Sequence, residues 1–561
     1  MKVISRALSC DTSIKTPLLF KKLLLIKKLL MLFTVLFLFA AKGFAENEFS
    51  FRIAPRYSAA LNTGYFNSGF GASAVLDWQF FSFLPAGAFG RYMGVGACAA
   101  GGFGNMSVSD NSNMTLIEGG AGLFYQWRLF DRFTARLELC GGVYNYQWKE
   151  MKNTKLFFNS GLGACFHLFP YLAFFANGSY TGYAFSDKGP INTINACVGI
   201  SLNLGEIMRP AVRVQAQRIS QGRIFPVSFS WYSQNEFAVV RITNNEPNAI
   251  TGINASFFLE QFMNDSSVFA KLPRLGPGES ADIPVTALFN ESLLYLSDNI
   301  SANTLITIDY LSLGSKKTLQ FPLKMMIFHR NSISWDDDRR AAAFVSPRDS
   351  AAELFAKYTA QAARRYASLN PAAASAIPEK VMMAAALLNT FMLYGINYII
   401  DPASSYVELV ADASAIDRIN YPYQTLNFRG GDCSDLSILY CSVLEALGIE
   451  TAFITTPGHI YTAFAVDSDS WKHGNADIIE YQGKRWMPVE VTISHKGFAE
   501  AWRTGAWQWR TAGEKASLYP LKECWAIYAP VTVPQSSDFL PEMPSDQAII
   551  QTLQSELVKL R

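Results

Sequence analysis

The chain has 561 residues, more than one hydrophobic core supports, and this length predicts three or four domains. Its formal net charge of +2 gives no electrostatic reason to expect a nucleic-acid partner. Charged residues make up only 17% of the chain, and glycine and aromatic residues concentrate before residue 205. The first part of the chain is therefore expected to differ in kind from the rest.

Residues 1–45 have the order of a secretory signal peptide. Lysines precede a short apolar run that begins after Lys28, and the small-residue site Gly43-Phe44-Ala45 follows it. Export signals need this succession of charge, apolar helix and small residues. The alternative is a transmembrane anchor, for which the apolar run is short. We expect residues 1–45 to be removed, so that the mature chain is exported.

The cysteines indicate neither a disulfide scaffold nor a structural zinc site. Seven remain after residue 45, an odd number that cannot pair completely within the chain. Their spacing contains no Cys-x-x-Cys pair and no metal-ligand pattern. They are Cys98, Cys140, Cys165, Cys197, Cys433, Cys441 and Cys524. We expect no metal and no cofactor.

Residues 46–205 alternate between apolar and polar side chains in the two-residue rhythm of β-strands. Ile117, Leu123 and Tyr125 share one face of a segment, and Glu118 and Arg128 share the other. A soluble barrel buries the apolar face, whereas a membrane barrel turns it to the lipid and pairs the charges in its lumen. About eight such segments fit the region, each long enough to cross a membrane when tilted.

Turns and aromatic residues favour a membrane barrel over a soluble lipocalin-like barrel, the alternative for this region. Tight connections alternate with longer polar ones, and aromatic residues cluster near segment ends as interfacial girdles do. The pattern resembles the small eight-stranded outer-membrane barrels. The resemblance implies an eight-stranded antiparallel β-barrel in contact with outer-membrane lipid. The first and the last strand of such a barrel both have their free chain ends on the periplasmic side. The chain after residue 205 is therefore expected in the periplasm.

Residues 206–335 lose the glycines and read as several short strands separated by polar turns. This spacing predicts an immunoglobulin-like β-sandwich, resembling bacterial adhesion domains by pattern alone. The segment offers no convergent cluster of polar residues, so we expect it to act as a spacer or binding module. The charged run at residues 334–340 is expected to be a linker.

Residues 336–530 change to a helical period, and Cys433 lies where one amphipathic helix is expected to begin. Gly430 and Gly431 precede it, and Gly448 ends the apolar pattern as a C-cap glycine does. A helix start favours the thiolate and offers backbone N–H groups to an oxyanion. Cys441, deeper in the same helix among leucines, is expected to be a buried apolar filler.

Two later residues complete a candidate for thiol catalysis. His459 stands after a Pro-Gly turn at the mouth of an expected strand, and Glu490 stands near the end of the next one. A carboxylate at the second ring nitrogen orients an imidazole and stabilises the imidazolium. Cys433, His459 and Glu490 are therefore the candidate catalytic residues.

The stretches RGGDCSDLSILYCSVLEALGI, GHIYTAF and RWMPVEVT resemble the transglutaminase-like superfamily, with its papain-related α+β fold, over roughly residues 385–500. The resemblance implies that Cys433 is the nucleophile, His459 the general base and Glu490 the orienting acid. The family usually has aspartate at the position of Glu490, which makes the acid here one methylene longer. The residues after His459 also depart from the Ala-Trp often found there.

Two more residues are candidates for support of the site. Gln424 is a candidate amide donor to the oxyanion, with an ordinary loop glutamine as the alternative. Asp432 flanks the thiol and is expected to act electrostatically at the helix start. Residues 531–561 form a tail with a short helix behind a serine cap.

These features predict an outer-membrane-anchored protein with a periplasmic cysteine enzyme domain. The resemblance implies attack on a protein or peptide amide through a Cys thioester, as a peptidase, an amidase or an acyltransferase. The alternatives are a non-catalytic barrel anchor with binding or structural domains, and a porin-like or adhesin barrel. The small lumen of an eight-stranded barrel argues against conduction.

Overall fold

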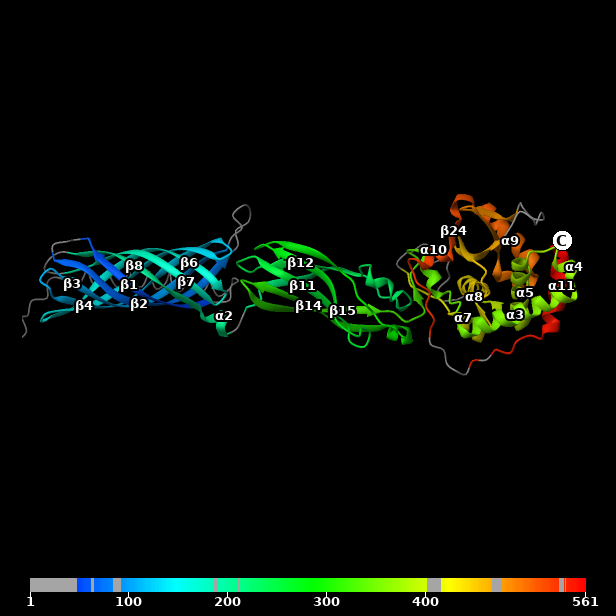
Figure 1. The fold of residues 1–561 in the computed structure, drawn as a ribbon, viewed down its shortest axis with the longest axis horizontal. Coiled ribbons are helices and arrows are strands. Elements are labelled where there is room, and N and C mark those ends of the chain that lie inside the picture. The colour runs from blue at the N-terminus through cyan, green and yellow to red at the C-terminus, as the bar shows by residue number, and fades with distance from the viewer. Residues whose placement is uncertain are drawn as a thin grey trace, which may run out of the picture.

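The computed structural model describes residues 48–560, apart from 62–64, 84–91, 186–189, 209–210, 401–414, 467–476, 534–538 and 540. The expected signal peptide lies outside the described residues. Three bodies follow one another in a row, namely a barrel, a two-sheet region and a mixed helical and β domain (Figure 1). The domain bounds expected from the sequence stay predictions.

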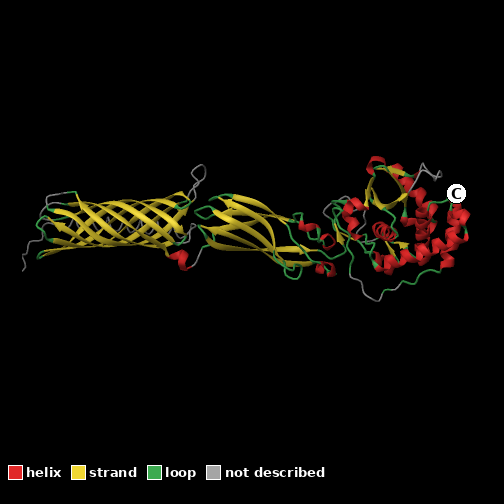
Figure 2. Ribbon diagram, viewed as in Figure 1, coloured by secondary structure: helices red, strands yellow, loops and turns green. Residues whose placement is uncertain are grey.

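The first body is a closed barrel of eight antiparallel strands, in which β8 pairs with β1 to complete the ring (Figure 2). This confirms the predicted eight-stranded fold. Its strands are β1 (Glu48–Ala60), β2 (Phe66–Phe83), β3 (Met93–Val108), β4 (Asn113–Phe130), β5 (Phe133–Trp148), β6 (Met151–Phe169), β7 (Leu172–Tyr183) and β8 (Ile191–Asn203).

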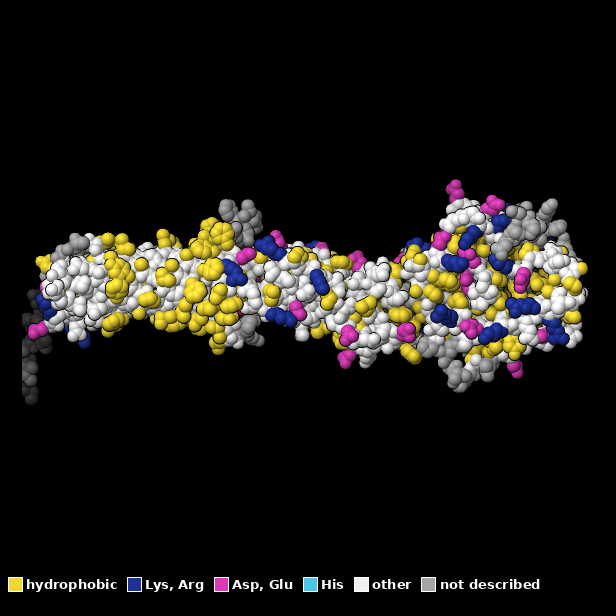
Figure 3. Space-filling model, viewed as in Figure 1, with side chains coloured by type: hydrophobic (Ala, Val, Ile, Leu, Met, Phe, Trp, Pro, Cys, Tyr) yellow, Lys and Arg dark blue, Asp and Glu magenta, His cyan; other side chains and the backbone are white. Residues whose placement is uncertain are grey.

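The barrel turns its apolar side chains outward and its charges inward. Ile117 and Leu123 are exposed, as the predicted outer face requires, and apolar side chains are spread over the barrel surface (Figure 3). Inside the lumen, Arg52 lies 2.7 Å from Asp77 and 2.9 Å from Glu138. A soluble barrel has the opposite arrangement, so the structure argues against the lipocalin-like alternative.

The lumen charges are expected to stabilise the barrel. Arg136 lies 2.7 Å from Asp77 and 3.2 Å from Glu138. Arg136→Ala leaves these buried carboxylates short of a cation, so we expect a loss of about 3 kcal/mol in unfolding free energy. Urea titration in detergent micelles measures it, with the exposed Lys152→Ala as control. Equal losses in the two variants would contradict the role of the lumen network.

The second body is a β-sandwich of two antiparallel sheets around one apolar core. The order is β13-β10-β9 in the first sheet and β12-β11-β14-β15 in the second. The more specific immunoglobulin-like topology stays a prediction. The strands are β9 (Val214–Gln221), β10 (Ala238–Asn244), β11 (Ile250–Phe258), β12 (Ser267–Leu275), β13 (Ser280–Val285), β14 (Ile300–Ser312) and β15 (Ser315–Ile327). A short helix, α2 (Leu204–Met208), leads from the barrel toward it.

The third body packs helices against a five-stranded sheet of order β22-β23-β21-β20-β24. Its main helices are α3 (Ser350–Leu369), α5 (Glu379–Tyr394), α7 (Pro422–Phe428), α8 (Cys433–Ala446), α9 (Phe498–Ala512) and α11 (Asp546–Lys559). Its sheet contains β20 (Thr451–Thr456), β21 (His459–Val466), β22 (Ile479–Tyr481), β23 (Lys484–Val489) and β24 (Ser517–Pro520). Smaller elements are β16 (Ser332–Ile333), β17 (Asn397–Tyr398), β18 (Asp417–Arg418), β19 (Gly430–Gly431), α4 (Pro371–Ala374) and α10 (Leu521–Trp525).

The helix expected in the tail is part of this third body. The Ser545 side chain accepts a hydrogen bond from the Ala548 N–H and caps α11. Leu553 and Leu557 are fully buried in the same apolar cluster as residues of α3, α5 and α8. The end of the chain therefore helps to build the core that supports the helix carrying Cys433.

Candidate active site

Cys433 is the first residue of α8, as the sequence predicts. The Asp432 side chain caps the helix by accepting hydrogen bonds from the Ser434 N–H at 2.9 Å and the Asp435 N–H at 3.0 Å. The thiol residue is buried, with 4% of its surface exposed. The cap occupies these two N–H groups. The helix start therefore has fewer free N–H donors for an oxyanion than the sequence predicts.

The glycine pair before Cys433 meets a tight steric requirement. Gly430 and Gly431 form β19, which runs parallel to β17. A Cβ atom on Gly431 would lie 2.5 Å from the Cβ atom of Asp435. A larger residue there would displace Asp435, whose carboxylate accepts hydrogen bonds from the N–H and the side-chain amide of Asn420 at 2.7 and 2.8 Å. The glycine therefore lets the loop pack against the start of α8.

His459 and Glu490 form a close pair next to this helix. His459 Nε2 lies 2.5 Å from Glu490 Oε2, and the Glu490 side chain is almost wholly buried. The strand that carries His459 lies against α8, because the Ser437 hydroxyl donates to the Cys433 carbonyl at 2.6 Å and to the Ile460 carbonyl at 3.4 Å. Nε2 is engaged by the acid, so Nδ1 is the ring nitrogen left to take the thiol proton.

Thr492 holds the second carboxylate oxygen of Glu490, and the sequence pattern does not predict this role. Glu490 Oε1 accepts a hydrogen bond from the Thr492 hydroxyl at 2.6 Å and from its N–H at 3.1 Å. Burial alone would raise the pKa of Glu490, but the contacts with His459 and Thr492 lower it below its ordinary value. The carboxylate is therefore ionised at neutral pH and held from both sides.

Residues 392–491 match the family model of the transglutaminase-like superfamily. The match covers Cys433, His459 and Glu490, and it confirms the predicted transglutaminase-like domain. The match spans less than a fifth of the chain. No curated protein matches the chain.

Solved structures give weaker similarities. Neisserial surface protein A is 10% identical, with 28% of this chain and 97% of that chain covered and a TM-score of 0.22. Ail, the attachment invasion locus protein of Yersinia pestis, is 15% identical, with 28% and 100% covered and a TM-score of 0.20. The β domain of the Bordetella autotransporter BrkA is 9% identical, with 50% and 94% covered and a TM-score of 0.19. At such TM-scores the barrel assignment rests on its own strand pairing.

The thiol of the transglutaminase-like domain is harder to ionise than its helix position predicts. Burial and the carboxylate of Asp432 raise the pKa of Cys433 to about 12, although the backbone N–H groups of Ile460 and Ser434 lower it. The position at the helix start does not lower the pKa of this thiol below its ordinary value, because the effect of burial is larger. The thiol is therefore protonated at neutral pH, and it would need a base to act as a nucleophile.

Alkylation of Cys433 by iodoacetamide is expected to accelerate steadily from about pH 7 to about pH 9. An acid whose pKa is raised keeps its proton, and only the growing thiolate fraction reacts. Mass spectrometry of the peptide containing Cys433 measures the rate. A rate constant that does not change over this range would show that the thiolate is already formed at neutral pH.

The two supporting residues predicted from the sequence each have defined hydrogen-bond partners. Gln424 belongs to the first turn of α7, where its Oε1 accepts hydrogen bonds from Asn331 Nδ2 at 2.7 Å and the Tyr421 N–H at 2.9 Å. These bonds fix the orientation of its amide, and its role at an oxyanion stays a prediction. Asp432 caps α8, which is the electrostatic role at the helix start that its position predicts.

Tyr398 also belongs to this neighbourhood, and no sequence pattern points to it. It lies on β17, which pairs with the glycines of β19 just before Cys433. Partial burial raises the pKa of its hydroxyl, and the nearby Cys433, Asp432 and Glu490 groups raise it further. A half-exposed phenol that keeps its proton is a hydrogen-bond donor at the rim of the site.

Thr492→Val is expected to lower kcat about tenfold with little change in KM. The substitution keeps the shape of the side chain and removes one hydrogen bond to a charged group, worth about 1.5 kcal/mol. Thr492→Ser restores the hydroxyl and is expected to restore most of the rate. Steady-state kinetics on an amide substrate measure this, and unchanged kcat in Thr492→Val would refute a positioning role.

Two surveys of the described residues complete the description of the chain. No group of three or more His, Cys, Asp or Glu side chains is arranged to hold a metal ion in the part of the chain that the structure describes. Within the same residues, no helix has the length and apolarity needed to cross a membrane.

Proposed function

We propose that the chain is an outer-membrane-anchored protein whose transglutaminase-like domain attacks amide bonds through a Cys433 thioester. The observation that carries this proposal is the 2.5 Å contact between His459 Nε2 and Glu490 Oε2 beside the start of α8. This contact fixes the imidazole with Nδ1 left for the thiol, which is the arrangement a thiol nucleophile with a raised pKa requires.

The reaction follows from the position of each group. His459 Nδ1 takes the proton of the Cys433 thiol as the sulfur bonds to the amide carbonyl carbon. The resulting imidazolium is stabilised by the Glu490 carboxylate and gives its proton to the leaving nitrogen as the carbon–nitrogen bond breaks. Water or an amine then attacks the thioester and gives its proton to His459, which passes it to the Cys433 sulfur as the carbon–sulfur bond breaks and the thiol leaves. The acceptor decides whether the protein is a hydrolase or an acyltransferase.

The barrel supports the membrane part of the proposal. Apolar side chains cover its outer surface, and charges pair inside its lumen. Lipid stabilises such an outer surface, whereas water does not. The first residue of the barrel, Glu48, accepts a hydrogen bond from Arg213 just before β9, and α2 begins directly after the last residue, Asn203, so both lie at the mouth that faces the sandwich. Following the usual orientation of such barrels, the sandwich and the transglutaminase-like domain extend into the periplasm.

Acyl-enzyme trapping tests the enzymatic part. The purified full-length chain in detergent is incubated with a peptide amide library and then with hydroxylamine, which captures a thioester as a hydroxamate. We expect hydroxamate formation that is lost in His459→Ala. A chain that forms no hydroxamate and no acyl adduct with any peptide favours the alternative, a barrel anchor whose periplasmic domains bind without turnover.

Membrane fractionation tests the anchor. The mature chain is expected in the outer-membrane fraction, and its gel mobility is expected to change on heating, as folded β-barrels resist denaturation by detergent. A mature chain found entirely in the soluble fraction would refute the membrane barrel.

A further inference from the structure

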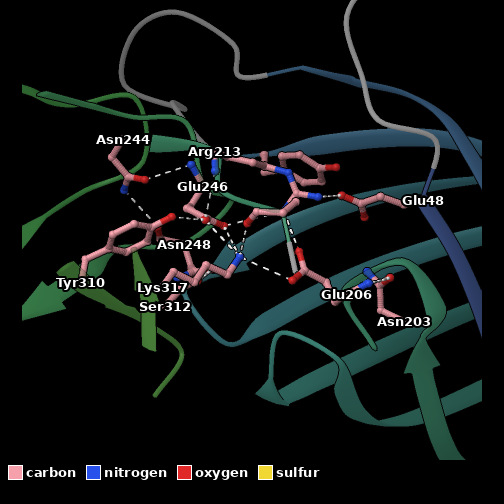
Figure 4. A network of polar contacts seen from close by, with 12 residues as sticks. Glu48, Asn203, Glu206, Arg213, Asn244, Glu246, Asn248, Tyr310, Ser312 and Lys317 are labelled. Carbon is pink, nitrogen blue, oxygen red and sulfur yellow. Dashed lines mark hydrogen bonds and ion pairs between the residues drawn. The ribbon is translucent and has the colours of Figure 1, made fainter. Parts of the chain in front are cut away.

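The mouth of the barrel is joined to the sandwich by a buried network of charged side chains (Figure 4). Glu48 comes from β1 and Glu206 from α2, and both belong to the barrel end of the chain. Glu246 comes from the turn between β10 and β11, and Lys317 from β15 of the sandwich. Arg213 stands between the two bodies, just before β9.

Two cations in this network each bridge the two bodies. Arg213 donates to Glu48 at 2.6 Å and to Glu206 at 2.9 Å, and it lies 3.7 Å from Glu246. Lys317 Nζ lies 3.1 Å from Glu246 and 3.4 Å from Glu206, with only 3% of its side chain exposed. Buried charged groups lose their contacts with water, and only close, well-oriented ion pairs compensate for this loss.

Further hydrogen bonds hold the network in place. Tyr310 donates to Glu246 at 3.0 Å, and Lys317 also donates to the Ala211 carbonyl at 2.5 Å. At the β4–β5 turn of the barrel mouth, the Ala249 N–H of the sandwich donates to Asp131 at 3.3 Å. Contacts made from several barrel elements oppose tilting of the sandwich.

The sandwich also forms part of the wall of a cavity at this mouth. A cavity of about 90 Å³ lies there, lined by barrel residues such as Arg52 and Asp77 and by sandwich residues such as Asn248 and Leu313. The connection between α2 and β9 spans only residues 209–213. A short connection keeps the two surfaces at high effective concentration, while the ion network selects one orientation.

A second junction of different chemistry joins the sandwich to the transglutaminase-like domain. Phe225 and Leu294 of the sandwich region share one apolar cluster with Cys433 and its neighbours. Arg340 lies 5.3 Å from the ring of Trp231 and 5.3 Å from the ring of Tyr528, between the two bodies. An apolar core shared across a boundary makes the two parts one packing unit.

We propose that the barrel, the sandwich and the transglutaminase-like domain form one rigid rod that holds Cys433 at a fixed height above the membrane. The strand β14 alone has 13 residues, which corresponds to roughly 44 Å of sandwich length. The transglutaminase-like domain is thus held at about that distance from the barrel and away from the membrane surface. This inference rests on the proposed membrane anchor and does not depend on turnover at the thiol.

The test measures the distance distribution between the barrel and the far end of the sandwich by double electron–electron resonance. Spin labels are placed on non-canonical residues at Tyr171 and Ser297, both exposed, because the chain has native cysteines. The full-length chain in detergent is expected to give one narrow distribution. Lys317→Met is expected to broaden it at least twofold, because Glu206 and Glu246 lose their shared cation.

Lys316→Met is the matched control, because Lys316 is the sequence neighbour and has 70% of its side chain exposed. Its distribution is expected to stay narrow. Glu246→Gln is a second variant, expected to broaden the distribution while the heat-dependent gel mobility reports an intact barrel. A broad distribution in the native chain, or a narrow one in both Lys317→Met and Glu246→Gln, would overturn the rigid rod.

Discussion

Cys433→Ala is expected to abolish acyl-enzyme formation and to lower turnover of an amide substrate at least about a thousandfold. Removing the nucleophile of a catalytic unit costs nearly the whole rate enhancement, since the partners have nothing to activate. A peptide vinyl sulfone that labels the native chain once is expected to leave Cys433→Ala unlabelled. Intact-protein mass spectrometry measures both labelling and its stoichiometry.

Cys441→Ala is the matched control for this variant. Cys441 lies in the same helix, is fully buried, and has its pKa raised mainly by that burial. It is expected to keep labelling and turnover within about threefold, with about 1 kcal/mol lost in unfolding free energy. Equal labelling of the native chain and Cys433→Ala would end the assignment of Cys433 as the nucleophile.

Glu490→Gln is expected to lower kcat by about three to four orders of magnitude with the fold retained. A glutamine amide that donates to Nε2 forces the ring proton onto Nδ1, and this tautomer cannot accept the thiol proton. Steady-state kinetics measure the loss. Glu450→Gln is the matched control, because Glu450 pairs with Lys484 away from the histidine.

The same substitution has a pH signature in stability. The folded-state pKa of Glu490 is lowered, so its contribution to folding is present above the unfolded pKa of about 4.3 and is lost as the pH falls through the folded value. The difference in unfolding free energy between the native chain and Glu490→Gln is therefore expected to shrink below about pH 4. A difference that grows on acidification would contradict an ionised, paired carboxylate.

Local patterns predicted the elements of this fold well. The two-residue alternation around Glu118 and Ile117 placed each side chain on the correct side of the barrel wall, because strand geometry is local. The helical repeat likewise located the start of α8 at Cys433, and the turn before His459 located a strand end. The resemblance to the transglutaminase-like superfamily groups the three catalytic candidates, Cys433, His459 and Glu490.

Local sequence patterns do not predict the long-range contacts of this fold. Thr492 holds Glu490, but a threonine two residues after an acid carries no signal of its own. The ion pair between Glu206 and Lys317 connects elements that are more than a hundred residues apart in the sequence, and periodicity does not predict such a contact. The thiol pKa also depends on burial and on Asp432, and these outweigh the helix-start effect that a sequence pattern suggests.

Labelling in intact cells tests the central claim most directly, because it reports chemistry and location together. Cells that produce the native chain or His459→Ala are treated with the vinyl sulfone probe, fractionated, and the labelled residue is identified by mass spectrometry. A barrel-anchored thiol enzyme predicts label on Cys433, in the outer-membrane fraction, and loss of that label in His459→Ala. Label that is absent from Cys433, independent of His459, or confined to a soluble fraction would contradict it.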